Sequence, residues 1–151
     1  MANLKEIADK ANSLFNAHDA TGLAELDADE VVQTIPGPSG RQKISGKDAV
    51  RDYQQAWFDG FPDARITIVT ELVGDDCVIT EGLFEGTHTG TFRTTMGDIP
   101  ATNKSVKGGY VLVSKFNDEG KGISANLYFD LMQFMVDLGL TPAPEAVPAT
   151  A

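Results

Sequence analysis

Hydrophobic and polar positions follow two different periods along this chain, and the changes of period divide it into helical and extended segments. Apolar residues recur at helical spacing over residues 3–16, 47–58 and 131–138, and a short helix fits 23–26. The extended segments read EVVQTIPG, ARITIVTEL, DCVITEGLFEGTHTGTF, KGGYVLVSKF and GISANLYF. RTTMGDIPATNKS and PGPSGRQKISG read as polar connections.

The order of these segments predicts an α+β fold rather than an alternating βαβ fold. Helices come first, and about four consecutive strands form the second half of the chain. We expect a curved antiparallel sheet whose concave face is covered by the helices, which would enclose an apolar pocket. One domain over residues 1–140 accounts for the pattern, and the Pro/Ala-rich tail 141–151 is predicted to be disordered.

Composition excludes several classes of function. The formal net charge is −10, with 22 acidic and 12 basic residues, which argues against nucleic acid as a partner. No stretch has the roughly 20 apolar residues of a membrane span, and the N-terminus lacks the features of a secretory signal, so we expect a cytoplasmic protein. The single cysteine, Cys77, reads as a buried structural thiol, and the two histidines are too far apart to predict a metal site.

The first candidate for chemistry is Asp130, at the end of the last strand. Strand alternation places Ser124, Asn126, Tyr128 and Asp130 on one face. If that face points into the pocket, it offers a phenol, an amide and a carboxylate suited to acid/base catalysis. The predicted pocket walls are Trp57, Phe58, Tyr53, Met132 and Met135.

Asp130 has a second interpretation, because it also begins the last helix. With Gln133 three residues later it forms a capping-box pattern, in which the carboxylate accepts backbone N–H groups. His88, in EGTHTGTF, either faces the pocket and shuttles a proton or only forms hydrogen bonds within the sheet. Gln33, which interrupts an apolar strand, is a further candidate for the pocket lining.

Five stretches together resemble one known family. FNAHD, VVQTIPGPSG, WFDGFPD, FEGTHTG and YFDLMQFMVDLGL are similar to the SnoaL-like polyketide cyclases, which belong to the NTF2-like superfamily. The resemblance covers nearly the whole chain up to Leu140. It implies a cone-shaped barrel with a deep pocket for a small apolar ligand and no cofactor. It also implies a homodimer or tetramer packed through the outer sheet face, for which Leu127, Phe129, Val111 and Val113 are the expected contacts.

In that family, an aspartate at the position of Asp130 is the acid/base for intramolecular aldol closure of a polyketide ester. The family also places a Gln and a His on the preceding strand, but YVLVSKF contains neither. His88, Asn126 or Tyr128 would then take over that role. A non-catalytic small-molecule-binding protein, and a ketosteroid-isomerase-like or epoxide-hydrolase-like enzyme, remain alternatives on the same pocket.

Overall fold

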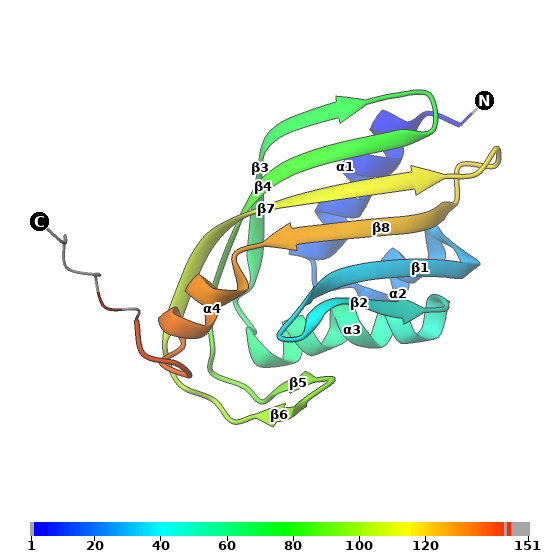
Figure 1. Ribbon diagram of the computed structural model, residues 1–151. Coiled ribbons are helices and arrows are strands. Elements are labelled where there is room, and N and C mark those ends of the chain that lie inside the picture. The colour runs from blue at the N-terminus through cyan, green and yellow to red at the C-terminus, as the bar shows by residue number, and fades with distance from the viewer. Residues whose placement is uncertain (1, 144, 146–151) are drawn as a thin grey trace, which may run out of the picture.

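The computed structural model describes residues 2–143 and residue 145. Within these residues, four α-helices and eight β-strands follow one another (Figure 1). The helices are α1 (Leu4–Asn16), α2 (Ala20–Glu25), α3 (Lys47–Gly60) and α4 (Leu131–Asp137). The strands are β1 (Asp27–Gly37), β2 (Gly40–Ser45), β3 (Arg65–Val73), β4 (Cys77–Thr87), β5 (Phe92–Thr94), β6 (Gly97–Ile99), β7 (Ser105–Phe116) and β8 (Gly122–Phe129).

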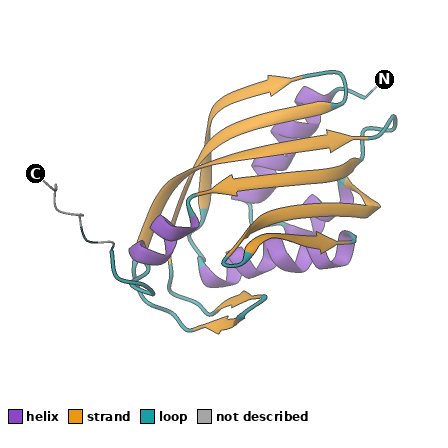
Figure 2. Ribbon diagram, in the orientation of Figure 1, coloured by secondary structure: helices purple, strands orange, loops and turns teal. Residues whose placement is uncertain are grey.

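A six-stranded sheet in the order β2-β1-β8-β7-β4-β3 forms the frame. It is strongly curved, and α1, α2 and α3 lie behind it in the view of Figure 2. α1 packs against β3 and β4, and α3 packs against β1. The α+β class and the curved sheet covered by N-terminal helices are therefore confirmed, although the sheet is open rather than closed into a barrel.

Three local features differ from the sequence-based predictions. β1 and β8 pair in parallel, so the sheet is not antiparallel throughout. Residues 40–45 form the edge strand β2, and the polar connection after β4 contains the small hairpin β5–β6. The parallel pairing of β1 with β8 joins segments far apart in the chain, so it depends on tertiary contacts. β2 and the β5–β6 hairpin pair across short turns, which their polar composition does not reveal. The predicted tail 141–151 lies largely outside the described residues.

The termini of the helices follow local sequence rules. Asn3 caps α1 and Asp19 caps α2, each through a side-chain oxygen that accepts a backbone N–H. α3 begins without a side-chain cap after Gly46, whose φ of 95° suits glycine. α1 and α3 turn their apolar stripes toward the sheet, as the periodicity predicts.

Two groups of buried side chains hold the layers together. The larger is rich in aromatic rings and joins α3, β5, β7 and the chain after α4; its members are Ala56, Trp57, Phe61, Ala64, Phe92, Val106 and Leu138. The smaller joins α1 to β4 through Leu4, Ala8 and Val78. The larger group also contributes Trp57 and Val106 to the wall of the cavity described next.

Candidate functional site

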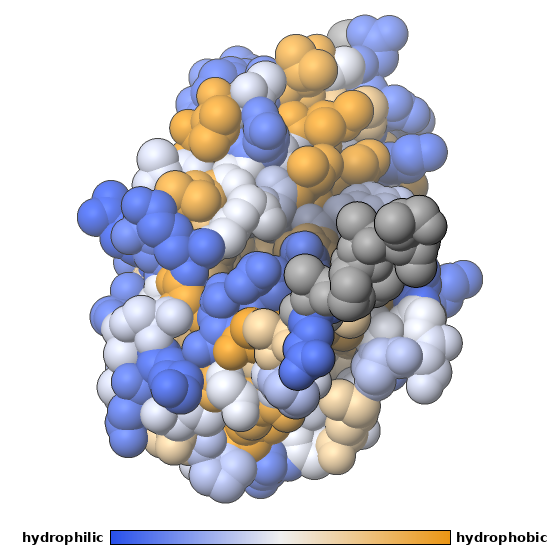
Figure 3. Space-filling model, turned by 60° about the vertical axis from the view of Figure 1, so that its left-hand side comes forward, coloured by the Kyte–Doolittle hydropathy of each residue, from blue (hydrophilic) through white to orange (hydrophobic). Residues whose placement is uncertain are grey.

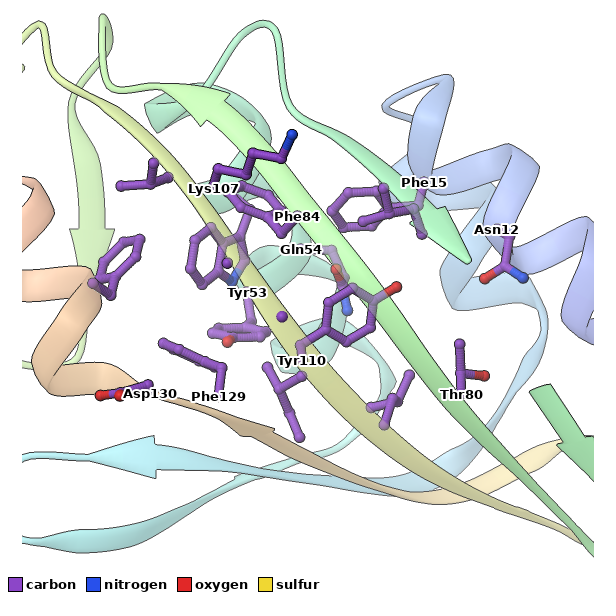
Figure 4. Close-up of a pocket in the computed structure, with 18 of the residues that line it drawn as sticks. Asn12, Phe15, Tyr53, Gln54, Thr80, Phe84, Lys107, Tyr110, Phe129 and Asp130 are labelled. Carbon is purple, nitrogen blue, oxygen red and sulfur yellow. The ribbon is translucent and has the colours of Figure 1, made fainter. Parts of the chain in front are cut away.

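A cavity of about 310 Å³ lies between the concave face of the sheet and the helices. This volume is within the range of small-molecule sites. Most of its wall is apolar, and the aromatic part consists of Phe15, Tyr53, Trp57, Phe84, Tyr110, Phe129 and Phe134. Figure 4 shows Phe15, Tyr53, Phe84, Tyr110 and Phe129 converging from both layers. The polar lining comes from Asn12, Gln33, Gln54, Thr80, Lys107, Asp130, Gln133 and Asp137.

The last strand, β8, turns its apolar residues toward this cavity. Leu127 and Phe129 line it, opposite Leu112 and Tyr110 of β7. The alternate residues face the other way, and Tyr128 is 50% exposed beneath the guanidinium of Arg41, which lies 4.1 Å from the ring centroid. The prediction that Asn126 and Tyr128 face the pocket is therefore wrong.

The expectation that Leu127 and Phe129 form an outer interface is wrong for the same reason. Alternation within a strand gives two faces, and the layer of helices decides which face is covered. Val111 and Val113 pair with Tyr128 and Asn126, so these two valines do lie on the outer face.

Asp130 lies at the rim of the cavity and also caps α4. Its Oδ1 accepts the backbone N–H of Gln133 at 2.9 Å, as the capping-box pattern predicts. The second interpretation of Asp130, as the N-cap of the last helix, therefore describes its hydrogen bonding. In Figure 4 the carboxylate points away from the rings of Tyr53 and Tyr110. Among the described residues, Gln133 is the hydrogen-bond partner that the structure gives this carboxylate, through Oδ1 alone.

Three further predicted lining residues do lie on the cavity wall: Trp57, Tyr53 and Gln33. Trp57 packs edge-on against Phe129 and Phe134, with ring centroids 6.1 and 5.5 Å apart. Burial raises the pKa of Tyr53 above that of an ordinary phenol, so its hydroxyl stays a proton donor. Whether these residues bind a substrate stays a prediction.

The other predicted wall residues lie elsewhere. Phe58 is buried against Phe15 and stacks on His18, with centroids 4.5 Å apart. Met132 is 62% exposed, and Met135 is half-buried outside the cavity lining. Their helix, α4, has only seven residues and places Gln133, Phe134 and Asp137 at the cavity instead.

His88 is completely buried, but behind the cavity rather than on its wall. Its ring stacks on Phe61 with centroids 5.1 Å apart, and Nδ1 accepts the backbone N–H of Thr102 at 3.3 Å. Burial lowers the pKa of this histidine, so the ring is neutral near pH 7. The alternative of a histidine that only forms hydrogen bonds within the protein therefore describes its environment.

The cavity residues that the sequence did not predict include Asn12, Gln54, Thr80 and Tyr110. Each occupies the inward phase of its own helix or strand; Asn12 follows Ala8 by four residues, and Thr80 follows the buried Val78 by two. In the sequence, a polar residue at the same helical or strand spacing as the buried apolar residues could have identified them. Tyr110 lies on β7, the strand on which the family resemblance predicts a Gln and a His.

Among residues 2–143 and 145, no group of three or more His, Cys, Asp or Glu side chains is arranged to hold a metal ion. Within the same residues, no helix is both long and apolar enough to cross a membrane.

The SnoaL-like polyketide cyclase family model matches residues 5–138, which is most of the chain. The chain belongs to this family. No curated protein is significantly similar to it in sequence. Its solved structural neighbours share the fold at low sequence identity.

A proposed SnoaL-like polyketide cyclase from Jannaschia sp. CCS1 has a TM-score of 0.74 and 17% identity, over 94% of this chain and 98% of the neighbour. IdmH from Streptomyces antibioticus, a proposed polyketide cyclase, has a TM-score of 0.70 and 22% identity, over 91% and 99%. AclR from Streptomyces galilaeus, a proposed hydroxylase, has a TM-score of 0.75 and 20% identity, over 94% and 84%. At these identities the likeness shows the NTF2-like fold.

Proposed function

We propose that this SnoaL-like protein is a cofactor-independent acid/base catalyst of the cyclase type. Its substrate would be a small apolar carbonyl compound, and its reaction an intramolecular aldol ring closure of a polyketide-like ester. One observation carries the proposal: a largely apolar cavity has the carboxylate of Asp130 at its rim. Family membership supports the same reaction class.

In the proposed reaction Asp130 acts first as a base. Its carboxylate takes a proton from the carbon between two carbonyl groups, and the resulting enolate forms a C–C bond to an internal carbonyl carbon. Asp130 then returns the proton to the alkoxide, so atoms and charge balance. The walls hold the chain in the folded conformation that closure needs.

Tyr53 is the proposed partner of Asp130. Its neutral hydroxyl can donate a hydrogen bond to the carbonyl oxygen on which negative charge develops. In Figure 4 this hydroxyl lies on the side of the cavity where Phe129 and Asp130 are found. It replaces the roles foreseen for His88, Asn126 and Tyr128, none of which lines the cavity.

The experiment separates the two roles of Asp130, which caps α4 and is the proposed base. Asparagine is as good an N-cap as aspartate, so Asp130→Asn keeps the cap and removes the base. We expect the folded protein to accelerate deuterium exchange at the α-carbon of apolar ketones and β-keto esters in D₂O, measured by NMR. The variant should lose roughly 10²- to 10⁴-fold of that acceleration with unchanged thermal stability.

Asp19→Asn, which makes the same change at the N-cap of α2 away from the cavity, is the matched control and should keep full activity. Equal activity of Asp130→Asn and the unmodified protein would contradict the proposal. It would favour the second candidate, a non-catalytic protein that only binds apolar molecules, which the engagement of Asp130 in capping also supports.

The outer face of the sheet is the proposed contact between copies of the chain. It carries exposed apolar side chains on β3 and β4, among them Val69, Leu72 and Ile79. Apolar side chains gather in the upper part of Figure 3, at the height where β3 and β4 lie in Figure 1. We expect light scattering to give the mass of a dimer, and Leu72→Lys to give a monomer.

A further inference from the structure

The strongest feature outside the proposed chemistry is the side chain of Glu71, which lies beneath α1 with only 8% of its surface exposed. Its Oε1 lies 3.3 Å from Nζ of Lys5. Its Oε2 accepts hydrogen bonds from Nδ2 of Asn12 at 3.2 Å and from Oγ1 of Thr80 at 3.4 Å. Glu71 thus links α1, β3 and β4 directly behind two residues of the cavity wall.

This arrangement fixes the direction of the neighbouring protons. A carboxylate only accepts hydrogen bonds, so Thr80 must direct its single hydroxyl proton toward Glu71. Asn12 must likewise present its NH₂ group rather than its carbonyl oxygen. Both residues line the cavity, and the remaining lone pairs of Thr80 Oγ1 and the Asn12 oxygen are then available to accept hydrogen bonds. Thr80 is buried, so an unfilled acceptor there is costly and a ligand donor is favoured.

Tyr110 supplies a donor next to these acceptors. The hydroxyl end of the Tyr110 ring packs against Gly82. A Cβ added at Gly82 would lie 2.4 Å from the Tyr110 hydroxyl oxygen, so only glycine leaves room for the ring. Gly82 is two residues from Thr80 on the same face of β4. Burial, together with the negative charge of Glu71, raises the pKa of Tyr110 to about 12, so its hydroxyl stays protonated. In Figure 4 this hydroxyl points toward the side of the cavity that holds Asn12 and Thr80.

We propose that Thr80, Asn12 and Tyr110, oriented by Glu71, form a binding site for a hydroxyl group of a neutral ligand. An alcohol donates a hydrogen bond to Thr80 Oγ1 or to the Asn12 oxygen, and it accepts a hydrogen bond from the Tyr110 hydroxyl. An ether or ketone can only accept. A carboxylate cannot donate either, and the negative charge of Glu71 repels it.

The hydroxyl site lies where two cavities meet. Asn12 and Thr80 also line a second cavity of about 130 Å³, whose walls include the apolar residues Ile7, Val31, Val50 and Val78. An apolar chain on either side of the hydroxyl group therefore has room. The inference concerns binding alone and holds whether or not Asp130 catalyses a reaction.

The test compares three probes of similar length: 1-octanol, octyl methyl ether and octanoate. Trp57, the only tryptophan of the chain, lies on the cavity wall, so its fluorescence reports binding of these transparent ligands. We expect 1-octanol to bind about five- to tenfold more tightly than the ether, and octanoate to bind most weakly. Equal affinity for 1-octanol and the ether would overturn the proposal.

Two variants assign the preference to this site. Thr80→Val keeps the shape but removes the acceptor, so the affinities for alcohol and ether should come within about twofold of each other. Thr70→Val, on the exposed outer face of β3, is the matched control and should keep the preference. If Thr80→Val retained the preference for the alcohol, the site would be wrong.

Glu71→Gln tests the orienting role. The new amide can donate to Thr80 Oγ1, which frees the Thr80 proton to point into the cavity, so the preference should shift toward the ether. Asp130→Asn, the variant that tests the proposed catalysis, should leave the preference unchanged. A folded Glu71→Gln protein, judged by circular dichroism, that keeps the full preference for the alcohol would contradict the role of Glu71.

Discussion

The two ends of the cavity are built from different interactions. At one end Trp57, Phe129 and Phe134 pack edge to face beside the rim residue Asp130. At the other end, side chains from α1 and β4 are tied to a buried carboxylate by hydrogen bonds. Aromatic packing determines the shape of a site and excludes water from it, but it orients a ligand only weakly. Hydrogen bonds are directional, so they determine which atoms of a ligand face which wall.

The carboxylates at these ends differ in the same way. Asp130 is exposed and has a single capping hydrogen bond through Oδ1 among the described contacts. Glu71 is buried and has two hydrogen bonds and an ion pair. A carboxylate at a rim can exchange protons with a substrate and with solvent. A carboxylate held by three partners is suited to positioning them, and this contrast can be tested by removing each element in turn.

The largest effect is expected at the aromatic end. Trp57→Ala leaves a hole among several rings and should lower the free energy of unfolding by about 3–5 kcal/mol, measured by urea denaturation. The same variant should lose most of its affinity for 1-octanol, measured by calorimetry. Tyr128→Ala removes an aromatic side chain from the exposed outer face and should cost less than about 1 kcal/mol. Similar losses for both variants would mean that Trp57 is not part of a packed wall.

A smaller effect is expected at the polar end. Glu71→Ala leaves Asn12 and Thr80 without their acceptor and should lower the free energy of unfolding by about 2–3 kcal/mol. Glu81→Ala, an exposed glutamate on the outer face of β4, should change it by less than about 0.5 kcal/mol. Urea denaturation of both variants checks this, and a Glu71→Ala protein as stable as Glu81→Ala would show that the polar end is not held together by Glu71.

The smallest effect is expected beyond the polar end, where Asp27 lines the second cavity. Burial raises the pKa of Asp27 to about 6 from 3.8, and Lys47 and Lys121 oppose the shift. The folded state then binds more protons than the unfolded state between about pH 4 and 6, so this carboxyl lowers stability as pH rises through that window. Above pH 6 the penalty is constant.

Asp27→Asn should therefore remove that slope and stabilise the protein at pH 7 by about 1 kcal/mol, a value reduced for partial solvent screening. Thermal unfolding between pH 4 and 8 measures it. Asp29→Asn, at an exposed carboxylate 3.6 Å from Lys47, is the control and should leave the pH profile unchanged. A profile that Asp27→Asn does not flatten would show that Asp27 is better solvated than the structure indicates.

Local patterns in the sequence were enough for most of the elements. The helical stripe of residues 3–16, the capping pattern at Asp130 and the hairpin of the last two long strands all appear as predicted. Each depends on neighbours within a few residues, or across one turn. Gln33, Tyr53 and Trp57 were also recognisable, because each is a polar or aromatic residue on an inward-facing apolar stripe.

The sequence by itself determined the α+β class, the family and the position of Asp130 between a strand and a helix. Only the tertiary structure decided that Leu127 and Phe129 face the cavity while Asn126 and Tyr128 face outward. It alone brought Glu71 to Asn12, 59 residues away. The physical reason is that strand alternation gives two equivalent faces, and only the packing of α1 and α3 across the sheet makes one of them the inside.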